Sequence, residues 1–443
     1  MVLVVGAGCS AEAPTCLPLA DECSEEAHRR LRLDGVLGEG DCADSSDLSC
    51  VADAVFDKTG SQRELVERLP REAFIKAEPN QGYLLAAAML RERALSCVLT
   101  LNFDLAMVSA LTAVGAQYDV SVVAGPEDHN RLTVANLVYL HRNANADPER
   151  WILRSASLAE EWRDQWQEVV AMRVIGGPVT VFAGLGTPAD VLVETTLRVW
   201  NAVPDKVRIY QVDPASPEES AFFAKLGLPA AAYLQMGWGM FMRALADRLV
   251  EEHRAELEGV CRHLLSTEGF EEEDVCGLCK RLAEMGLLRL GRLRARWVLS
   301  RHAYDPREPN KAALIADLLL AVGLIERVTG SQAVFGDDGV VEFRQGDRLL
   351  GSVILASGRG IRGWLAIETE IKQSEHNWEY HNPRPRRAIV AGVQGDRPVE
   401  IAPPGDLVCQ EDRDSIVTGY TSLEMFSVHE LRNIPAMAEG ILA

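Results

Sequence analysis

The stretch that decides the fold is Met1-Val-Leu-Val-Val-Gly6-Ala7-Gly8-Cys9-Ser10, at the start of the chain. The apolar run Val2 to Val5 indicates a short strand buried on both faces, as in a parallel sheet. Two glycines separated by one small residue follow the run, and Ser10 can cap the next helix. Glycine lets the backbone approach a ligand, and the N–H groups at a helix start attract phosphate. The stretch therefore predicts a nucleotide-binding loop at the edge of a doubly wound sheet.

The composition is that of a folded protein with more than one domain. The chain has 443 residues, of which 47% are hydrophobic and 25% are charged, so we expect two or three domains. No apolar run is long enough to span a bilayer and no signal peptide precedes the first strand, which predicts a cytoplasmic protein without membrane contact. A net charge of −20 disfavours a general nucleic-acid surface. In a cytoplasmic protein, the ten cysteines are expected to be free thiols rather than disulfides.

Further short apolar segments end in residues that are typical of binding sites. These segments and the residues that follow them are 96–101 with Asn102 and Asp104, 137–140 with His141, 178–183 with Gly184, Gly186 and Thr187, and 207–212 with Asp213. The carboxyl ends of parallel strands meet at one edge of a sheet, where open α/β proteins bind their ligands. A structural interpretation stays open, because Asn and Asp also cap helices and a single His is more often structural than catalytic.

Three domains are expected along the chain. Residues 1–245 would form the sheet domain, with helices up to Leu33 and across 51–95, a Gly- and Asp-rich loop over 34–50, and a helical stretch over 143–170. Residues 246–330 are predicted to be helical and possess a pattern similar to a winged helix. Residues 331–443 contain strand patterns at 340–344, 349–357, 364–371, 388–393 and 407–409, which predicts a smaller α/β or β-rich domain.

The ordered motifs of residues 1–245 resemble those of sirtuin-like NAD-binding domains. They are Gly6-Ala7-Gly8-Cys9-Ser10 with Leu17-Pro18, Thr100-Leu101-Asn102-Phe103-Asp104, Leu140-His141, Gly184-Leu185-Gly186-Thr187 and Val212-Asp213-Pro214. Within that family, the chain is most similar to the bacterial sirtuin-like NADases of anti-phage defence systems.

The resemblance implies a role for each of these residues. Asn102 would orient a water molecule or the nicotinamide ribose, Asp104 would contact the nicotinamide amide, and His141 would act as a base. The implied cofactor-binding set is Gly6, Ala7, Gly8, Ser10, Pro18, Thr100, Gly184, Gly186, Thr187 and Asp213. An acidic, pre-oriented pocket suits the positive charge that develops on the sugar when the nicotinamide–ribose bond breaks.

Some positions depart from the family pattern. Arg142 stands where the family usually has a glycine after its His, and Cys16 stands where a glycine is expected before Leu17-Pro18. Residues 105–183 contain no cysteine, so the zinc ribbon of deacetylating sirtuins is absent and hydrolysis of NAD⁺ itself is favoured. A dehydrogenase is disfavoured, because the third glycine of the G-x-G-x-x-G pattern is missing.

The resemblance implies an NAD⁺ glycohydrolase whose substrate is NAD⁺. It further implies a homo-oligomer controlled by assembly, by a defence-system partner such as an ATPase, or by a phage-derived trigger. Two alternatives stay open. The first is a module that binds NAD⁺ or ADP-ribose without chemistry. The second is a nuclease, because Asp347 followed by Glu368, Glu370 and Lys372 is similar to the PD-(D/E)xK pattern, in which carboxylates bind Mg²⁺.

The second half of the chain holds two other candidate sites. Arg289, Arg292, Arg294, Arg296 and Arg301 form a basic cluster, although arginines on a helix more often form a solvated face. Cys261, His263, Cys276 and Cys279 are four candidate zinc ligands. Because the C-x-x-C pair falls inside an expected helix, we predict thiols without a metal there.

Overall fold

The computed structural model describes residues 1–155, 174–186, 190–202, 208–264, 271–297, 309–336, 340–357, 386–392, 423–434 and 436–442. The chain divides into two compact units, Met1–Ala246 and Asp247–Ala443, and each is described by itself. The sequence predicts boundaries at 245 and 330, whereas the structure groups the helices after Ala246 with the second sheet.

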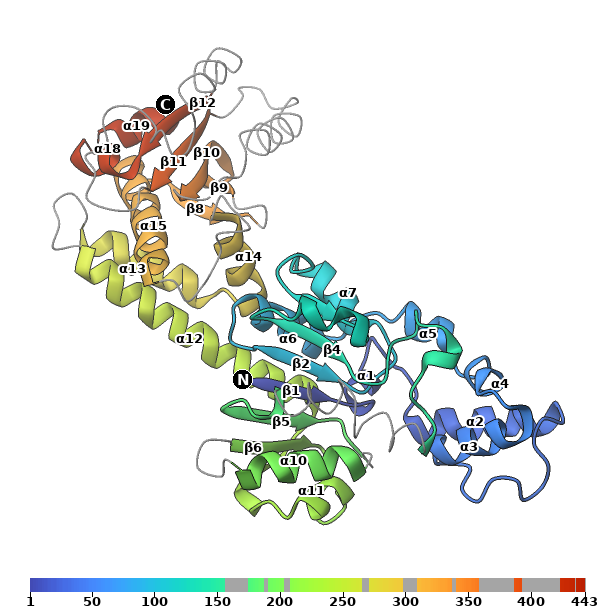
Figure 1. The fold of residues 1–443 in the computed structure, drawn as a ribbon. Helices are drawn as coiled ribbons and strands as arrows, with labels where there is room; N and C mark the ends of the chain where they lie inside the picture. Colours follow the sequence, from blue (N-terminus) through green and yellow to red (C-terminus); the bar gives the residue numbers. More distant parts are fainter. Residues whose placement is uncertain are drawn as a thin grey trace. The chain divides into compact units, whose positions relative to one another are not determined.

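The first unit is built on a fully parallel sheet of seven strands (Figure 1). The strand order is β3 (Ser121–Val123), β4 (Asn136–Tyr139), β2 (Cys97–Thr100), β1 (Val2–Val5), β5 (Val179–Ala183), β6 (Arg208–Asp213) and β7 (Tyr233–Gln235). From β1 the chain passes to β2, then to the edge strand β3, and returns to β4 between them; it resumes at β5 on the other side of β1 and continues to β6 and β7. This order confirms the predicted doubly wound sheet, with its switch point between β1 and β5.

The helices of the first unit connect these strands. They are α1 (Gly8–Ala11), α2 (Ala20–Leu33), α3 (Leu48–Thr59), α4 (Arg63–Val66), α5 (Arg71–Ile75), α6 (Gln81–Arg91), α7 (Ala106–Ala113), α10 (Asp190–Ala202), α11 (Ala221–Leu226) and the start of α12 (Trp238–Leu264). Figure 1 shows α10 and α11 alongside β5 and β6.

Local sequence explains why these elements form where they do. All side chains of β1 are buried, with at most 3% of their surface exposed, as the unbroken apolar run predicts. The Asn80 side chain accepts a hydrogen bond from the Tyr83 N–H and so caps α6. Asp47 caps α3 in the same way, and Gly60, with φ of 73°, ends that helix. The rings of Phe182 in β5 and Phe222 in α11 meet edge to face with centroids 4.9 Å apart, which packs α11 onto the sheet.

One predicted element of the first unit is wrong, and one strand escaped prediction. Residues 143–154 form turns and a short 3-10 helix, η2 (Pro148–Arg150), instead of an α-helix. Asp147 caps η2 at the Glu149 N–H and Pro148 starts it, so local turn chemistry prevails over the apolar spacing. The rest of the predicted helix, with Trp162 and Trp166, lies in 156–173, outside the described residues. The edge strand β7 has three residues and is too short to leave a pattern.

The second unit combines helices with a mixed five-stranded sheet. Its elements are α13 (Glu272–Ala283), α14 (Leu287–Trp297), α15 (Pro309–Thr329), β8 (Gln332–Phe335), β9 (Val340–Gln345), β10 (Arg348–Ser357), β11 (Arg386–Gly392), β12 (Leu423–Ser427), α18 (Val428–Asn433) and α19 (Met437–Leu442). The strand order is β12-β11-β10-β9-β8, with β8, β9 and β10 antiparallel and β10, β11 and β12 parallel. This confirms the predicted smaller α/β part. The predicted strands at 364–371 and 407–409 lie outside the described residues.

Helix α15 is the central element of the second unit. It contacts β8, β10, β11, α13, α18 and α19, and residues Leu319 to Val322 have no exposed surface. A helix that is apolar on all sides is buried in this way. The fully buried Asp274 of α13 accepts hydrogen bonds from Arg327 of α15, at 2.8 Å from Nε and 3.2 Å from Nη2. No helix of the described residues is long and apolar enough to cross a membrane.

Candidate functional site

The candidate residues meet at one edge of the first sheet, where all its strands have their carboxyl ends. Val5 is in register with Thr100 and with Ala183, and these pair in turn with Tyr139 and Val212. The residues that follow these strands therefore emerge at the same level. This carboxyl edge carries Gly6, Asn102, His141, Gly184 and Asp213, which is the arrangement that the strand ends predict.

Two glycine loops pack against each other over the switch point. The Gly6 N–H donates to the Ala183 carbonyl and the Gly8 N–H to the Gly184 carbonyl, each at 3.0 Å. A Cβ on Gly8 would lie 2.8 Å from Gly184 Cα, and a Cβ on Gly6 would lie 2.5 Å from Gly184 O. Contact between the loops therefore requires glycine here whether or not a ligand binds. At Gly186, by contrast, a Cβ would meet nothing within 4 Å.

Most backbone N–H groups of the first glycine loop already have acceptors inside the protein. Besides Gly6 and Gly8, the Cys9 N–H donates to the Gly6 carbonyl and the Ser10 N–H to the Ala7 carbonyl. Among the described residues, the Ala7 N–H is the one of this loop with no acceptor in the protein. A backbone N–H without a protein acceptor at a helix start is the kind of group that can donate to an anion.

A buried polar cluster of Ser10, Tyr83, Asn102 and Asp104 ties the first loop to β2 and α6. Ser10 Oγ lies 2.7 Å from both Tyr83 Oη and Asp104 Oδ2. Asn102 Nδ2 donates to Ser10 Oγ at 3.1 Å, to Tyr83 Oη at 3.2 Å and to the Gly6 carbonyl at 3.0 Å. The four side chains are buried, and such satisfied networks hold their members rigidly.

Asp104 is both a helix cap and a buried acid. Its Oδ1 accepts a hydrogen bond from the Ala106 N–H at 2.9 Å at the start of α7, and Tyr139 Oη donates to its backbone carbonyl at 3.0 Å. Burial raises the pKa of Asp104 above its usual range, although the hydrogen bond from Ser10 works in the opposite direction. The carboxyl group is therefore held with less hydration than an exposed aspartate.

His141 follows β4 and lies beside aromatic rings. Its ring centroid is 6.4 Å from that of Phe103, which stacks on Trp151 at 4.2 Å with the planes 10° apart. Burial lowers the pKa of His141 to about 4, because removal from water disfavours the charged imidazolium. The imidazole is therefore neutral at pH 7 and can accept a proton.

Arg142 and Cys16 adopt backbone conformations that glycine favours. Arg142 has φ of 72° and Cys16 has φ of 44°, both in the left-handed region that costs an L-residue energy. The chain thus keeps a glycine-like backbone at both positions although a side chain is present.

The other predicted residues are spread around this edge. Thr100 is buried, and its Oγ1 accepts the Asn102 N–H at 3.0 Å. Pro18 is exposed on the loop after α1. Asp213 Oδ1 accepts the Ala215 N–H at 2.9 Å, so it also orders the turn after β6. Thr187 lies outside the described residues.

Two residues of the site were not among the predicted ones. Tyr83 is not among the candidate residues of the sequence, yet its hydroxyl joins the cluster. Asn80 Nδ2 donates to the Cys9 carbonyl at 2.8 Å and so supports the loop after the glycines. A tyrosine among the aliphatic residues of α6 was the available signal, but its partners are distant in the chain.

Among the described residues, the remaining candidates outside this edge give no metal site. Cys261 is buried, Cys276 is exposed and Cys279 is half-buried, and no three His, Cys, Asp or Glu side chains of the described residues are placed to hold a metal. Arg289 donates to the Phe335 carbonyl. Several candidates lie outside the described residues. They are the side chains of Arg294 and Arg296, the whole of Arg301, and the charged residues at 368, 370 and 372.

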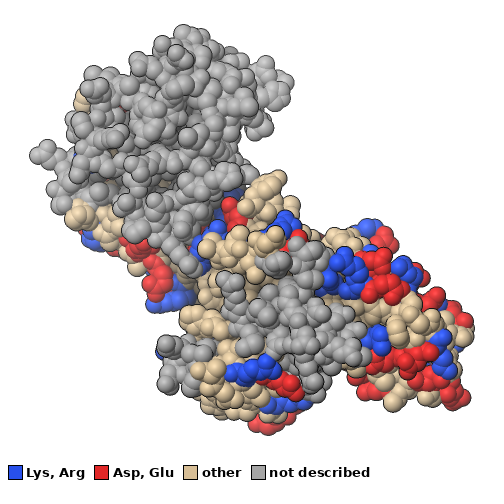
Figure 2. Space-filling view, viewed as in Figure 1, with Lys and Arg blue, Asp and Glu red and all other residues tan. Residues whose placement is uncertain are grey.

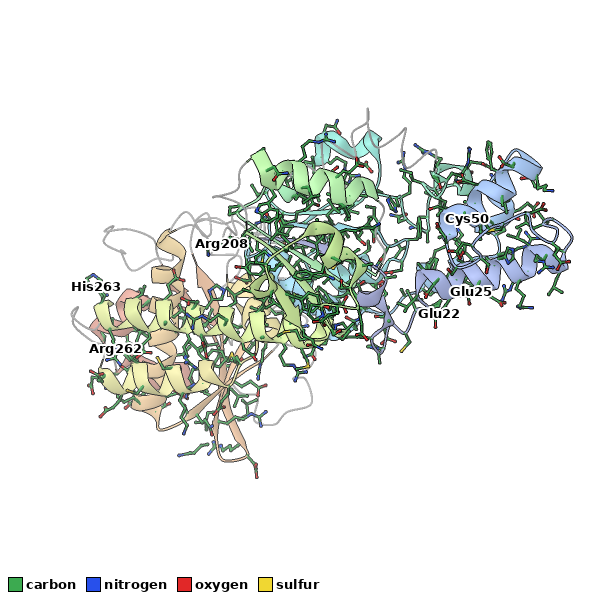
Figure 3. All side chains as sticks on the ribbon, turned by 90° about the horizontal axis from the view of Figure 1, so that it is seen from below. Glu22, Glu25, Cys50, Arg208, Arg262 and His263 are labelled. Carbon is green, nitrogen blue, oxygen red and sulfur yellow. The ribbon has the colours of Figure 1, made fainter. Side chains whose placement is uncertain are left out.

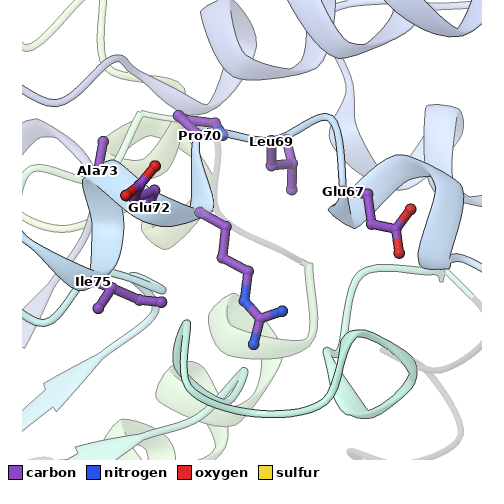
Figure 4. Close-up of a pocket in the computed structure, with 7 residues that line it drawn as sticks. Glu67, Leu69, Pro70, Glu72, Ala73 and Ile75 are labelled. Carbon is purple, nitrogen blue, oxygen red and sulfur yellow. The ribbon is translucent and has the colours of Figure 1, made fainter.

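An open hollow of about 430 Å³ lies at α5 and the segment that joins it to α4 (Figure 4). Its lining includes Leu69, Pro70, Glu72 and Ile75. Arg71, also in the lining, donates to the carbonyl groups of Ala144 and Ala146. The hollow brings no candidate catalytic residues together.

Comparison with known proteins gives partial structural matches only. No known family model and no curated protein matches the chain. A Sir2 homologue in complex with NAD matches with 16% sequence identity and a TM-score of 0.31, over 54% of this chain and 85% of that chain. Sir2 in complex with an inhibitor, 2′-O-acetyl-ADP-ribose and a deacetylated peptide matches with 12% identity and a TM-score of 0.30, over 56% of this chain and 92% of that chain. At these TM-scores the likeness carries no argument, and the fold class rests on the observed strand order.

Proposed function

We propose that the first unit hydrolyses NAD⁺ to nicotinamide and ADP-ribose. The observation that carries the proposal is the meeting of the Ser10–Tyr83–Asn102–Asp104 cluster, the neutral His141 and the two glycine loops at one carboxyl edge. The switch point of a doubly wound sheet is where such folds bind nucleotides. A pyrophosphate would accept the Ala7 N–H and use the open space beside Gly186.

The residue types suit the proposed reaction. Cleavage of the nicotinamide–ribose bond builds positive charge on the sugar, and the buried Asp104 carboxyl group is held close by to oppose that charge. His141 would take a proton from a ribose hydroxyl or from water. A pKa of about 4 makes it a weak base in the free protein, and the anionic pyrophosphate of the bound substrate would raise that pKa.

The test is release of nicotinamide from NAD⁺ by the full chain. Asn102→Ala and His141→Ala should each lower the rate by about 10²-fold or more. Asn136→Ala is the matched control, because Asn136 is an equally buried asparagine at the amino end of β4, on the opposite edge of the sheet. Loss of activity in all three variants alike would indicate a folding defect and contradict the assigned roles.

A second function, binding of NAD⁺ or ADP-ribose without chemistry, has its own supporting observation. The Asn102 amide and both Asp104 carboxylate oxygens already make hydrogen bonds that stabilise the loops. Calorimetric binding of NAD⁺ to a chain that releases no nicotinamide would favour this function. If the chain neither binds NAD⁺ nor releases nicotinamide, both proposals are contradicted.

We also propose that this activity serves bacterial anti-phage defence, controlled by the second unit through assembly or a partner protein. Support comes from the sequence motifs and from the presence of a second folded unit. In bacteria expressing the chain with its neighbouring genes, phage infection should lower cellular NAD⁺. The His141→Ala variant should abolish this fall, and an equal fall with that variant would contradict the proposal.

A further inference from the structure

Two thiols of the first unit lie close together, far from the carboxyl edge. Cys42 is in the segment between α2 and α3, and Cys50 is in the first turn of α3. Their sulfur atoms are 3.3 Å apart. Both are free and half-buried. Figure 3 shows Cys50 on α3, with Glu22 and Glu25 on the neighbouring α2.

The geometry is close to that of a disulfide and can reach it. A disulfide has its sulfur atoms about 2.05 Å apart, so the pair must approach by little more than 1 Å. Residues 41–47 contain no helix or strand, and Cys42 can therefore move while α3 stays in place.

The surroundings of the pair are acidic. Every charged residue of the segment 34–50 is Asp or Glu, namely Asp34, Glu39, Asp41, Asp44 and Asp47. Lys58 lies 2.9 Å from Asp41 and Arg68 lies 2.7 Å from Asp34, so these two acids are paired. In Figure 2, Asp and Glu side chains gather on the surface formed by α2 to α5, interspersed with Lys and Arg.

This setting decides which reagents can reach the pair. Burial and the neighbouring Cys50 sulfur raise the pKa of Cys42 to about 11, which keeps it as a thiol at pH 7 and slows attack. An anionic disulfide would be repelled by the acidic segment, whereas a cationic disulfide would be attracted.

We propose that Cys42 and Cys50 form a dithiol modification site that is oxidised to an intramolecular disulfide by small cationic disulfides. One thiolate attacks the reagent, forms a mixed disulfide and expels one thiolate of the reagent. The second protein thiolate then attacks that mixed disulfide and expels the other half. The protein loses two hydrogen atoms, and the reagent is reduced to two thiols. The step is independent of NAD⁺ chemistry.

The test uses the full chain with cystamine as the cationic disulfide and oxidised glutathione as the anionic one. After the remaining thiols are alkylated, the mass of the peptide joining Cys42 to Cys50 should fall by about 2 Da relative to its dithiol form. Cystamine should react roughly fivefold faster than glutathione. The exposed Cys16, which has no thiol neighbour within hydrogen-bonding distance among the described residues, should instead acquire a mixed disulfide and its added mass.

Two variants complete the design. In the Cys50→Ser variant, Cys42 should keep its mixed disulfide with the reagent, because no second thiol is available to displace it. Cys16→Ser should leave formation of the Cys42–Cys50 disulfide unchanged. The proposal is overturned if Cys42 and Cys50 of the wild type carry mixed disulfides with the reagent instead of an intramolecular disulfide. It is also overturned if both stay reduced when Cys16 has reacted fully. Equal rates for the two reagents would overturn the assignment of a cationic partner.

Discussion

The backbone at Arg142 makes an unusual stability prediction. Arg142 has φ of 72°, and an L-residue pays roughly 1–2 kcal/mol for the left-handed region. Glycine pays nothing there but loses about 0.5–1 kcal/mol in chain entropy relative to alanine. Arg142→Gly should therefore be more stable than Arg142→Ala by about 0.5–1 kcal/mol. Both variants lose the long hydrogen bond from Arg142 to the Ala124 carbonyl, at 3.4 Å, so the comparison isolates the backbone.

Arg29 supplies the matched control. It lies on the exposed face of α2 and pairs with Glu26, and in a helix alanine is more stable than glycine by about 1 kcal/mol. The order of the two variants should thus reverse between positions 142 and 29. Cys16, with φ of 44°, should behave like Arg142.

Urea unfolding of the full chain measures the effect, supported by thermal midpoints. A difference of 0.5–1 kcal/mol corresponds to roughly 1–4 °C for a unit of this size. Arg142→Ala being as stable as Arg142→Gly would refute the strain at this position. Since Arg142 directly follows His141, the same pair also tests the site: Arg142→Gly should keep any nicotinamide release, because the loop conformation is unchanged.

Three further predictions concern the site. The pKa of His141 in the folded protein is lowered from 6.5 to about 4, so between these pH values only the unfolded chain takes up the proton. The free energy of unfolding therefore falls as the pH drops from 6.5 to 4. His141→Gln should remove up to about 3 kcal/mol of that fall when stability is measured against pH. Tyr83→Phe removes a hydroxyl that makes two hydrogen bonds and should lower the free energy of unfolding in urea by about 1–2 kcal/mol. The control Tyr210→Phe, at a half-buried tyrosine, should change it little. Equal losses of stability in the two variants would argue against the cluster. Gly8→Ala places a Cβ 2.8 Å from the facing loop and should lower the free energy of unfolding by about 1–3 kcal/mol. The Cβ of Gly186→Ala meets open space, so this control should keep the stability of the wild type. Equal thermal midpoints for the two variants would contradict the observed loop packing.

The sequence by itself determined the sheet and the edge that carries the site. Unbroken apolar runs such as Val2–Val5 are local signals, because a strand buried on both faces needs no partner to be recognised. The polar and glycine residues after each run follow from the same local pattern. Parallel pairing then places all strand ends on one edge, so the sequence alone could assign Asn102 and His141 to a common site.

Only the tertiary structure decided what those residues do to one another. Ser10 and Tyr83 are 73 residues apart and meet at 2.7 Å, and no local spacing predicts such a contact. The glycines at 6, 8 and 184 were interpreted as ligand contacts, but packing between two loops distant in the chain already requires them. Periodicity reports which face of an element is buried, whereas distances and dihedral angles depend on how distant segments pack.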